Sequence, residues 1–310
     1  MRLKMSNNIL FRADSSSTIG TGHIMRDLVL AQQYAKKGNH IIFATQDLKG
    51  NINHKIIEAN YQLKVLKSNN IEELEKLIKE LKINMIVIDH YDIDSKFEKK
   101  LKDNNPHLNI LSFDDTYEKH DCDILLNHNI SADKKRYKGL VPKECELRCG
   151  DNYTLLRDEF LEEIKKRKKK KNNNFTTIFI AMGGADHSNI NIKILKVLKK
   201  FTNLKVNLVT TTANKNLEEL KKYCKDKSWI KLHINSNKIA KLINKSKLAI
   251  VTPSVTVNEV YFMKVPLIAI KTAENQNDMY QYLKQQKLDV LKKFDKQTLL
   301  NKLHKYLKEN

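Results

Sequence analysis

Short apolar runs alternate with longer segments of helical periodicity along most of the chain. The run 9–11 is followed by a polar loop, after which Ile24, Leu28, Ala31 and Ala35 recur at the spacing of one helix face. Further strand-like runs in the first half are 41–44, 62–66, 85–88, 109–113 and 124–126. Strands that alternate with helices in this way predict parallel sheets joined by crossover helices.

A polar stretch at 165–174, rich in Lys and then Asn, interrupts this alternation. The pattern restarts with strand-like runs at 177–182, 206–210, 231–234, 248–251 and 265–270. We therefore predict an α/β fold of two doubly wound parallel-sheet domains facing a cleft, with residues 1–164 and 175–310 joined by a basic linker at 165–174. Ligands of such sheets bind beyond the carboxyl ends of the strands, so we expect the site in that cleft.

Composition narrows the classes of protein that remain. The hydrophobic fraction of 41% in 310 residues suffices for a sizeable core. There is no run of about 18 apolar residues and no apolar leader, which predicts a cytoplasmic protein without stable membrane insertion. The 4 cysteines do not form a disulfide framework, and their spacing does not indicate a metal site.

The formal net charge of +21 leaves two interpretations open. A basic surface can bind nucleic acid, but lysines are scattered along the whole chain, as expected of a chain biased toward Lys and Asn. The densest basic run, 165–171, has no interleaved aromatic residue of the kind that stacks on bases. We therefore expect no nucleic-acid partner.

Four of the 8 glycines form two pairs, each between a strand and a helix. Gly20 and Gly22 make one pair, and Gly183 and Gly184 make the other. Glycine at such a turn lets the backbone approach a phosphate, while the helix N-terminus supplies amide donors. Each pair alone is also explained by a tight turn, but two such loops in two domains suggest a bound diphosphate.

His23 directly follows the first glycine pair and begins a predicted helix. A helix N-terminus disfavours the imidazolium, which favours a neutral ring able to accept a proton. His23 is therefore a candidate catalytic base.

Other polar residues follow predicted strands, where site residues gather in this architecture. Asp89, His90 and Tyr91 end one strand, and Asp114 and Asp115 end the next. A paired carboxylate can hold a metal, but a solvated strand end explains it equally well. In the second half the residues in such positions are Thr252 to Ser254, Asn258, Glu259, and Glu274 to Asn277; a carboxylate such as Glu259 can accept both ribose hydroxyls.

Together these motifs resemble the UDP-sugar hydrolases of the pseudaminic acid pathway. The resemblance runs in order from about residue 7 to 286 and leaves the C-terminal tail without an assigned role. The matching segments are 11–17, 19–24, 26–31, 88–91, 111–115, 122–127, 139–142, 148–150, 156–160, 182–186, 257–259 and 275–276.

The resemblance implies a GT-B type fold and hydrolysis of UDP-2,4-diacetamido-2,4,6-trideoxy-β-L-altropyranose by direct attack of water, with no metal and no cofactor. Direct displacement inverts the anomeric carbon. The predicted site comprises His23 as the base; Gly20, Gly22, Tyr91, Arg157 and Asn275 on the substrate side; and Gly183, Gly184, Ser254, Asn258 and Glu259 on the nucleotide side.

The sequence departs from the family pattern at Asp92, where the family has glycine, and at Pro253 before Ser254. Two alternatives stay open: a glycosyltransferase on the same scaffold and, from a different class, a basic nucleic-acid-binding protein. We expect a UDP-sugar substrate as the partner and a monomer as the oligomeric state.

Overall fold

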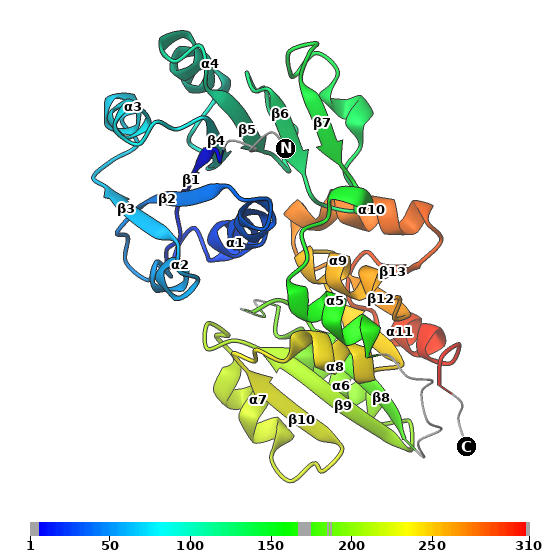
Figure 1. Cartoon of the computed structure of the whole chain (residues 1–310). Coiled ribbons are helices and arrows are strands. Elements are labelled where there is room, and N and C mark those ends of the chain that lie inside the picture. The colour runs from blue at the N-terminus through cyan, green and yellow to red at the C-terminus, as the bar shows by residue number, and fades with distance from the viewer. Residues whose placement is uncertain (1–5, 167–174, 185, 187, 308–310) are drawn as a thin grey trace. The chain divides into compact units, whose positions relative to one another are not determined.

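The computed structural model describes residues 6–166, 175–184, 186 and 188–307. The chain divides into two compact units, Met1–Leu156 and Arg157–Asn310, each built on its own parallel sheet (Figure 1). The predicted α/β class with two doubly wound parallel sheets is therefore confirmed.

The first unit has a seven-stranded sheet in the order β3-β2-β1-β4-β5-β6-β7. Its strands are β1 (Asn8–Ala13), β2 (His40–Gln46), β3 (Gln62–Leu66), β4 (Met85–Asp89), β5 (Asn109–Phe113), β6 (Ile124–Asn127) and β7 (Glu146–Cys149). Its helices are α1 (Gly22–Ala35), α2 (His54–Glu58), α3 (Ile71–Glu80), α4 (Ser95–Asn104) and the 3₁₀ turns η1 (Lys134–Tyr137) and η2 (Asp151–Tyr153).

The second unit has a six-stranded sheet in the order β10-β9-β8-β11-β12-β13. Its strands are β8 (Thr176–Ala181), β9 (Leu204–Thr210), β10 (Ile230–Ile234), β11 (Leu248–Val251), β12 (Leu267–Ile270) and β13 (Asp289–Leu291). Its helices are α5 (Asp158–Lys165), α6 (Ile190–Leu198), α7 (Leu217–Cys224), α8 (Ile239–Lys245), α9 (Val255–Phe262), α10 (Asn277–Gln285), α11 (Lys296–Leu303) and the turn η3 (Glu274–Gln276).

Side chains of the first sheet alternate between two buried faces, as the two-residue period of a strand requires. In β1, Ile9 and Phe11 pack with Ile24 and Leu30 of α1. Leu10, from the same strand, packs in the opposite core with residues of α3 and α4. Both faces are covered by helices, which explains why these strands are continuous apolar runs.

The order of the strands reverses beside β1. The chain continues from β1 to β2 and β3 on one side and then crosses to β4 on the other side. The register pairs Ala13, the last residue of β1, with Asp89, the last residue of β4. Loops that leave these two strands diverge, so a crevice opens at this point.

The boundary between the units lies before α5, whereas the sequence analysis placed residues up to 164 in the first domain. Helix α5 packs against α8 of the second unit, where the Asn244 side-chain amide donates to the backbone carbonyl of Glu163 at 2.9 Å. Apolar periodicity alone does not reveal which sheet a connecting helix covers. Most of the predicted linker at 165–174 lies outside the described residues.

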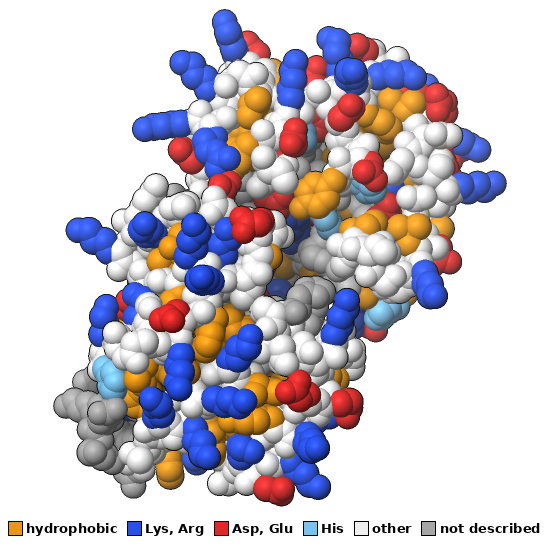
Figure 2. All heavy atoms as spheres, turned by 180° about the vertical axis from the view of Figure 1, so that it is seen from behind, with side chains coloured by type: hydrophobic (Ala, Val, Ile, Leu, Met, Phe, Trp, Pro, Cys, Tyr) orange, Lys and Arg blue, Asp and Glu red, His pale blue; other side chains and the backbone are white. Residues whose placement is uncertain are grey.

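Within the described residues, no helix combines the length and the apolar character that crossing a bilayer requires. Figure 2 shows Lys and Arg side chains spread over one face of the chain, with Asp and Glu among them, rather than gathered in one patch. This distribution agrees with the interpretation of the net charge as a compositional bias.

Candidate active site

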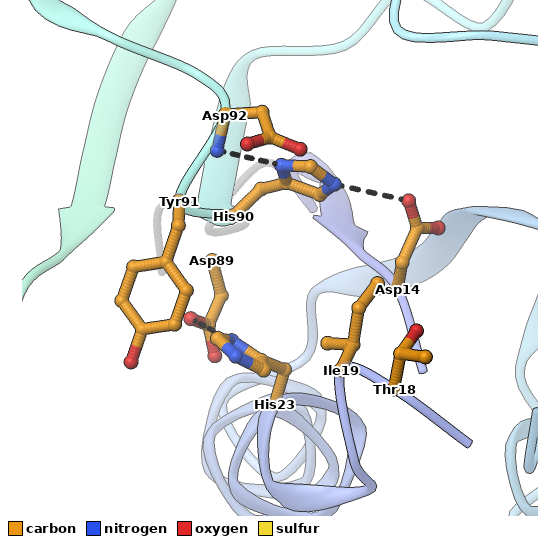
Figure 3. A pocket seen from close by; sticks show the side chains of 8 residues that line it. All are labelled: Asp14, Thr18, Ile19, His23, Asp89, His90, Tyr91 and Asp92. Atoms are coloured by element: carbon orange, nitrogen blue, oxygen red, sulfur yellow. Dashed lines mark hydrogen bonds and ion pairs between the residues drawn. The ribbon is translucent and has the colours of Figure 1, made fainter. Parts of the chain in front are cut away.

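A pocket of about 280 Å³ opens at the strand-order reversal of the first unit (Figure 3). One wall comes from the loop after β1 and the start of α1, and the other from the residues after β4. The lining residues are Asp14, Thr18, Ile19, His23, Asp89, His90, Tyr91 and Asp92. The positive φ of Gly20, 89°, which suits glycine, lets the loop fold back as an isolated bridge between Ser16 and Gly20.

His23 lies in the first turn of α1, and its Nδ1 atom is 2.6 Å from Oδ1 of Asp89 (Figure 3). The alternation of side chains along β4 explains why Asp89 reaches His23. Val87 belongs to the core that contains α1, so Asp89, two residues later, faces the same helix. The pair joins residues 66 positions apart in sequence.

The Asp89 side chain is 1% exposed and fully ionised. Burial alone would raise its pKa, but the Arg26 guanidinium and the bond with His23 hold the pKa well below its usual range. Because Asp89 is a carboxylate, Nδ1 of His23 carries the proton in this bond. In the neutral tautomer that this contact favours, the lone pair of the ring is on Nε2.

Arg26 and Asp115 extend this arrangement to Tyr91. Arg26 donates to both oxygens of Asp89 and, at 3.4 Å, to Asp115. The hydroxyl of Tyr91 donates to the other oxygen of Asp115 at 3.0 Å. The rings of Tyr91 and His23 meet edge to face with centroids 5.0 Å apart. Burial and the Asp115 charge raise the pKa of Tyr91 to about 12, so it stays a neutral hydroxyl.

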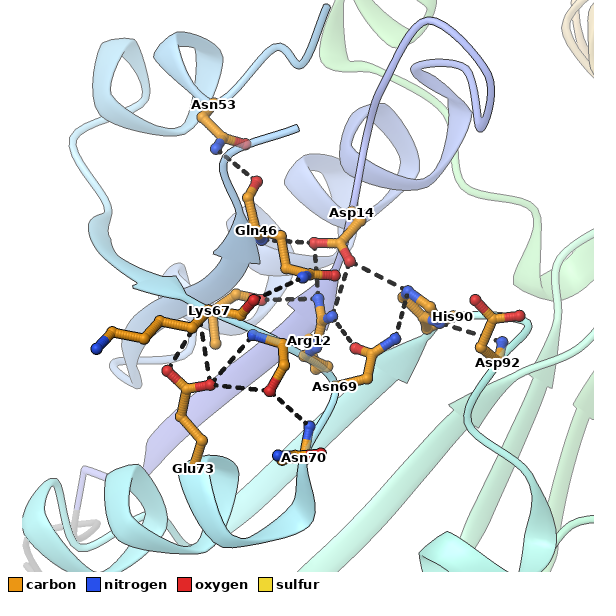
Figure 4. A network of polar contacts seen from close by, with 12 residues as sticks. Arg12, Asp14, Gln46, Asn53, Lys67, Asn69, Asn70, Glu73, His90 and Asp92 are labelled. Carbon is orange, nitrogen blue, oxygen red and sulfur yellow. Dashed lines mark hydrogen bonds and ion pairs between the residues drawn. The ribbon is translucent and has the colours of Figure 1, made fainter. Parts of the chain in front are cut away.

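The opposite wall depends on a second arginine–aspartate pair (Figure 4). Arg12, 1% exposed, donates to both oxygens of Asp14 at 2.8 and 2.7 Å. The backbone N–H of Asp92 donates to Nδ1 of His90 at 3.1 Å, so Nε2 of His90 carries the proton and donates it to Asp14 at 3.1 Å. Although burial opposes it, bonds from His90 and Arg12 hold the pKa of Asp14 well below its usual range. His90 is thus a fixed donor and not a base.

Asp27 lies one helical turn after His23, is 0% exposed, and neither of its carboxyl oxygens finds a hydrogen-bond donor. Burial, followed by the charge of Asp89, raises the pKa of Asp27 well above its usual range. We conclude that Asp27 is a neutral acid, which can donate its proton to Asp89. His128, also buried, has its pKa lowered to about 3 by burial and by Arg26, so it is neutral too.

The residues predicted to hold the nucleotide lie in the second unit, at its own strand-order reversal between β8 and β11. Gly183 and Gly184 follow β8, and a Cβ on Gly184 would lie 2.9 Å from Oγ1 of Thr211, so a larger residue there would require Thr211 to move. Ser254 precedes α9 as its N-cap residue. Asn258 is buried within that helix.

Arg157, predicted on the substrate side, contacts Glu259, predicted on the nucleotide side, at 3.3 Å. Burial raises the pKa of Glu259 to about 7, although Arg157 opposes this shift. Asn275 is exposed in the turn η3 that follows β12. The structure therefore brings His23 and Tyr91 together in one pocket, and Arg157 and Glu259 together in the other unit.

Asp114 and Asp115 are neighbours in sequence but contact different partners. Asp114 accepts from the backbone of Thr116 and Tyr117 at 2.9 and 2.8 Å, whereas Asp115 bonds Arg26 and Tyr91. Across the part of the chain that the structure describes, no three His, Cys, Asp or Glu side chains gather in a potential metal site.

The sequence analysis assigned no role to Arg26, Asp89 or Asp115. The position of Arg26 could have been inferred from the sequence, because it follows His23 by three residues and residues at that spacing share one face of a helix. Asp89 was noted only as a strand end, and Asp115 only as a strand end or as one of a pair of carboxylates that can hold a metal. Their partners depend on the register of β1, β4 and β5, which local patterns do not fix.

Comparisons with known proteins show which family this chain belongs to. No protein-family model matches the chain. The UDP-2,4-diacetamido-2,4,6-trideoxy-β-L-altropyranose hydrolase of Campylobacter jejuni is 42% identical over 286 residues, which cover 92% of this chain and 99% of that protein. The chain belongs to the family of this hydrolase.

Solved structures show the fold of this hydrolase family member to be GT-B. MurG of Acinetobacter baumannii superposes with a TM-score of 0.63 at 11% identity, covering 96% of this chain and 90% of MurG. The glycosyltransferase of kitacinnamycin gives 0.68 at 10% identity, covering 98% and 92%. The predicted GT-B fold and family resemblance are both confirmed.

The protonation of Asp27 predicts how the stability of this hydrolase family member depends on pH. The folded state keeps the Asp27 proton at a pH where the unfolded chain releases it, so wild type loses stability as pH rises above about 4. Asp27→Asn, which remains neutral, should therefore raise the melting temperature more at pH 8 than at pH 5.

Thermal unfolding of both proteins at the two pH values measures this difference, with exposed Asp103→Asn as the control. A loss of stability in Asp27→Asn that grows with pH would mean that Asp27 is ionised in the folded protein.

Proposed function

We propose that this protein hydrolyses UDP-2,4-diacetamido-2,4,6-trideoxy-β-L-altropyranose to UDP and the free sugar, as a step of pseudaminic acid biosynthesis. The identity to the Campylobacter jejuni hydrolase, over nearly all of both chains, supports the substrate. The observation that carries the chemistry is the His23–Asp89 pair in the pocket at the strand-order reversal. It is the arrangement of a general base whose second nitrogen is oriented by a carboxylate.

In the proposed mechanism, Nε2 of His23 removes a proton from a water molecule as that water attacks the anomeric carbon. The bond from this carbon to the diphosphate oxygen breaks, and its electron pair leaves with UDP. Asp89 stabilises the imidazolium that forms, and His23 then returns its proton to solvent. A single displacement inverts the anomeric carbon.

The second unit supplies the proposed nucleotide contacts. Backbone amides of the Gly183–Gly184 turn and at the start of α9, beside Ser254, are suited to the negative charge that develops on UDP. Glu259 and Asn258 are proposed to bind the ribose and its surroundings, and Arg157 and Asn275 the sugar diphosphate. Tyr91, Gly20 and Gly22 complete the sugar side next to His23.

The proposed reaction requires no metal, because UDP is a good leaving group once amides and an arginine stabilise its charge. Four carboxylates near His23, those of Asp14, Asp89, Asp114 and Asp115, are already engaged by arginine, histidine or backbone donors. We further propose that the protein acts as a monomer in the cytoplasm and binds no nucleic acid.

An NMR time course with the UDP-sugar tests this function. We expect stoichiometric UDP and free sugar without any acceptor, initial formation of the inverted anomer, and the same rate in excess EDTA. UDP release that depends on an added acceptor would instead indicate a glycosyltransferase. Activity lost in EDTA and restored by Mg²⁺ or Mn²⁺ would contradict the metal-free mechanism.

Substitution of the proposed base should abolish most turnover. A positioned general base contributes about 10²–10⁴-fold, so His23→Ala should lower kcat by at least a hundredfold while UDP still binds. Steady-state kinetics together with UDP titration separate the two effects, and exposed His107→Gln serves as the control. Retention of more than about a tenth of the wild-type kcat would exclude His23 as the base.

Glu259 should act on nucleotide affinity and not on the chemical step. Hydrogen bonds from the ribose hydroxyls to a carboxylate contribute about 1.5–3 kcal/mol, so Glu259→Ala should raise KM roughly 10- to 100-fold with kcat little changed. Because the pKa of Glu259 is about 7, the wild-type KM should rise as pH falls below that value, and this dependence should vanish in the variant.

Inhibition by UDP across pH measures this contact directly, with exposed Glu162→Gln as the control. Equal UDP inhibition of wild type and Glu259→Ala would show that other residues hold the nucleotide.

A further inference from the structure

Arg26 lies one helical turn after His23 and contacts Asp89, one of the residues that line the pocket. Its side chain is 13% exposed. Nε donates to Oδ2 of Asp89 at 2.6 Å and Nη2 to Oδ1, so the guanidinium holds both oxygens of one carboxylate. Such a two-point contact fixes the plane of the carboxylate, and with it the oxygen that bonds His23.

The third nitrogen of the same guanidinium contacts a carboxylate that follows a different strand. Nη1 of Arg26 donates to Oδ2 of Asp115 at 3.4 Å, and Oδ1 of Asp115 accepts from the Tyr91 hydroxyl at 3.0 Å. Tyr91 is 63% exposed, so packing alone does not fix its ring. Its orientation depends on Asp115 and on its edge contact with His23.

The guanidinium is itself held in place by Phe113. The centre of the guanidinium lies 4.9 Å from the centroid of this ring, at the last residue of β5. The last residue of β5 therefore supplies the ring under Arg26, and the loop that follows supplies, two residues later, the Asp115 carboxylate that Arg26 contacts. A lysine in this position has no planar group to stack and cannot hold two carboxylates with a fixed geometry.

Two other buried titratable groups, Asp27 and His128, lie in the electrostatic field of Arg26. Asp27 carries its proton because burial and Asp89 raise its pKa, and burial keeps His128 neutral by lowering its pKa to about 3. The cation is thus shared between Asp89, behind His23, and Asp115, behind Tyr91.

We propose that Arg26 is a positioning residue that holds His23 and Tyr91 in one fixed relation by binding the carboxylate behind each of them. This inference rests on the proposed function, in which His23 is the base and Tyr91 lies on the sugar side. Arg26 does not touch the substrate in this proposal. It acts by fixing the position of His23, the proton acceptor, relative to Tyr91, the sugar contact. A displacement of about 1 Å in such a site can lower the rate on the order of 10²-fold.

A double-mutant cycle tests the Tyr91 arm. If Asp115 acts through Tyr91, Asp115→Asn and Tyr91→Phe should each lower kcat/KM about tenfold, and the double variant should be no worse than the weaker single variant. Losses that multiply would show that Asp115 has a separate structural role and would overturn the proposal. Melting temperatures of all three variants exclude simple destabilisation.

Arg26→Lys should lower kcat about 10- to 100-fold and should make a further Tyr91→Phe substitution nearly neutral. The matched control is Arg148→Lys, which changes another arginine that holds a carboxylate at two points, on Glu146, outside this pocket. If Arg26→Lys fails to fold, the Asp115 cycle still decides the proposal.

A measurement without turnover separates this proposal from the proposed function. The edge-to-face contact with His23 should shift the NMR signals of the Tyr91 ring, which Tyr91→Phe identifies. Arg26→Lys and Asp115→Asn should move these signals toward those of free tyrosine, whereas Arg148→Lys should not. Unchanged signals in both variants would overturn the positioning role. A wild type that shows these shifts but does not hydrolyse the UDP-sugar would contradict only the function.

Discussion

A carboxylate without contact with water is stable only when its charge is paired, and Asp89 imposes this constraint on the first unit. Arg26 supplies the opposite charge, His23 supplies a further donor, and Asp27 remains protonated beside them. Removing one member of such a buried pair typically costs about 3–5 kcal/mol. The geometry of the candidate base is therefore part of the stability of the fold and not an addition to it.

The same principle operates on the opposite face of the sheet, where Arg12 pairs with Asp14. On each face an arginine fixes a buried carboxylate, and the carboxylate fixes the proton of a histidine. The outcome differs because of the second nitrogen of each ring. In His90 it accepts a backbone N–H, whereas Nε2 of His23 retains its lone pair. Two similar clusters thus give one acceptor and one fixed donor in a single pocket.

The alternation of apolar runs was sufficient to predict two parallel sheets, and the glycine–histidine segment with Tyr91 located the pocket residues. The partner of His23 was not predictable, because it depends on which strand lies beside β1 and on the register that pairs Ala13 with Asp89. The contacts of α5 with α8 were not predictable for a similar reason, since an amphipathic helix does not reveal which sheet it covers. Sequence motifs indicated the candidate residues, and tertiary pairing determined which side chains meet in the pocket.

The protonation states of the side chains in the pocket also bear on the kind of bond that the proposed reaction breaks. Asp14 and Asp89 are both held as carboxylates, and the proton of His90 is committed to Asp14. None of these three groups is available to protonate a departing oxygen. The proposed reaction needs no such acid, because a nucleoside diphosphate departs as an anion, whereas the alcohol of an ordinary glycoside leaves only with the help of an acid. Such an enzyme can release an activated sugar in a cell and spare the finished glycans that contain related sugars.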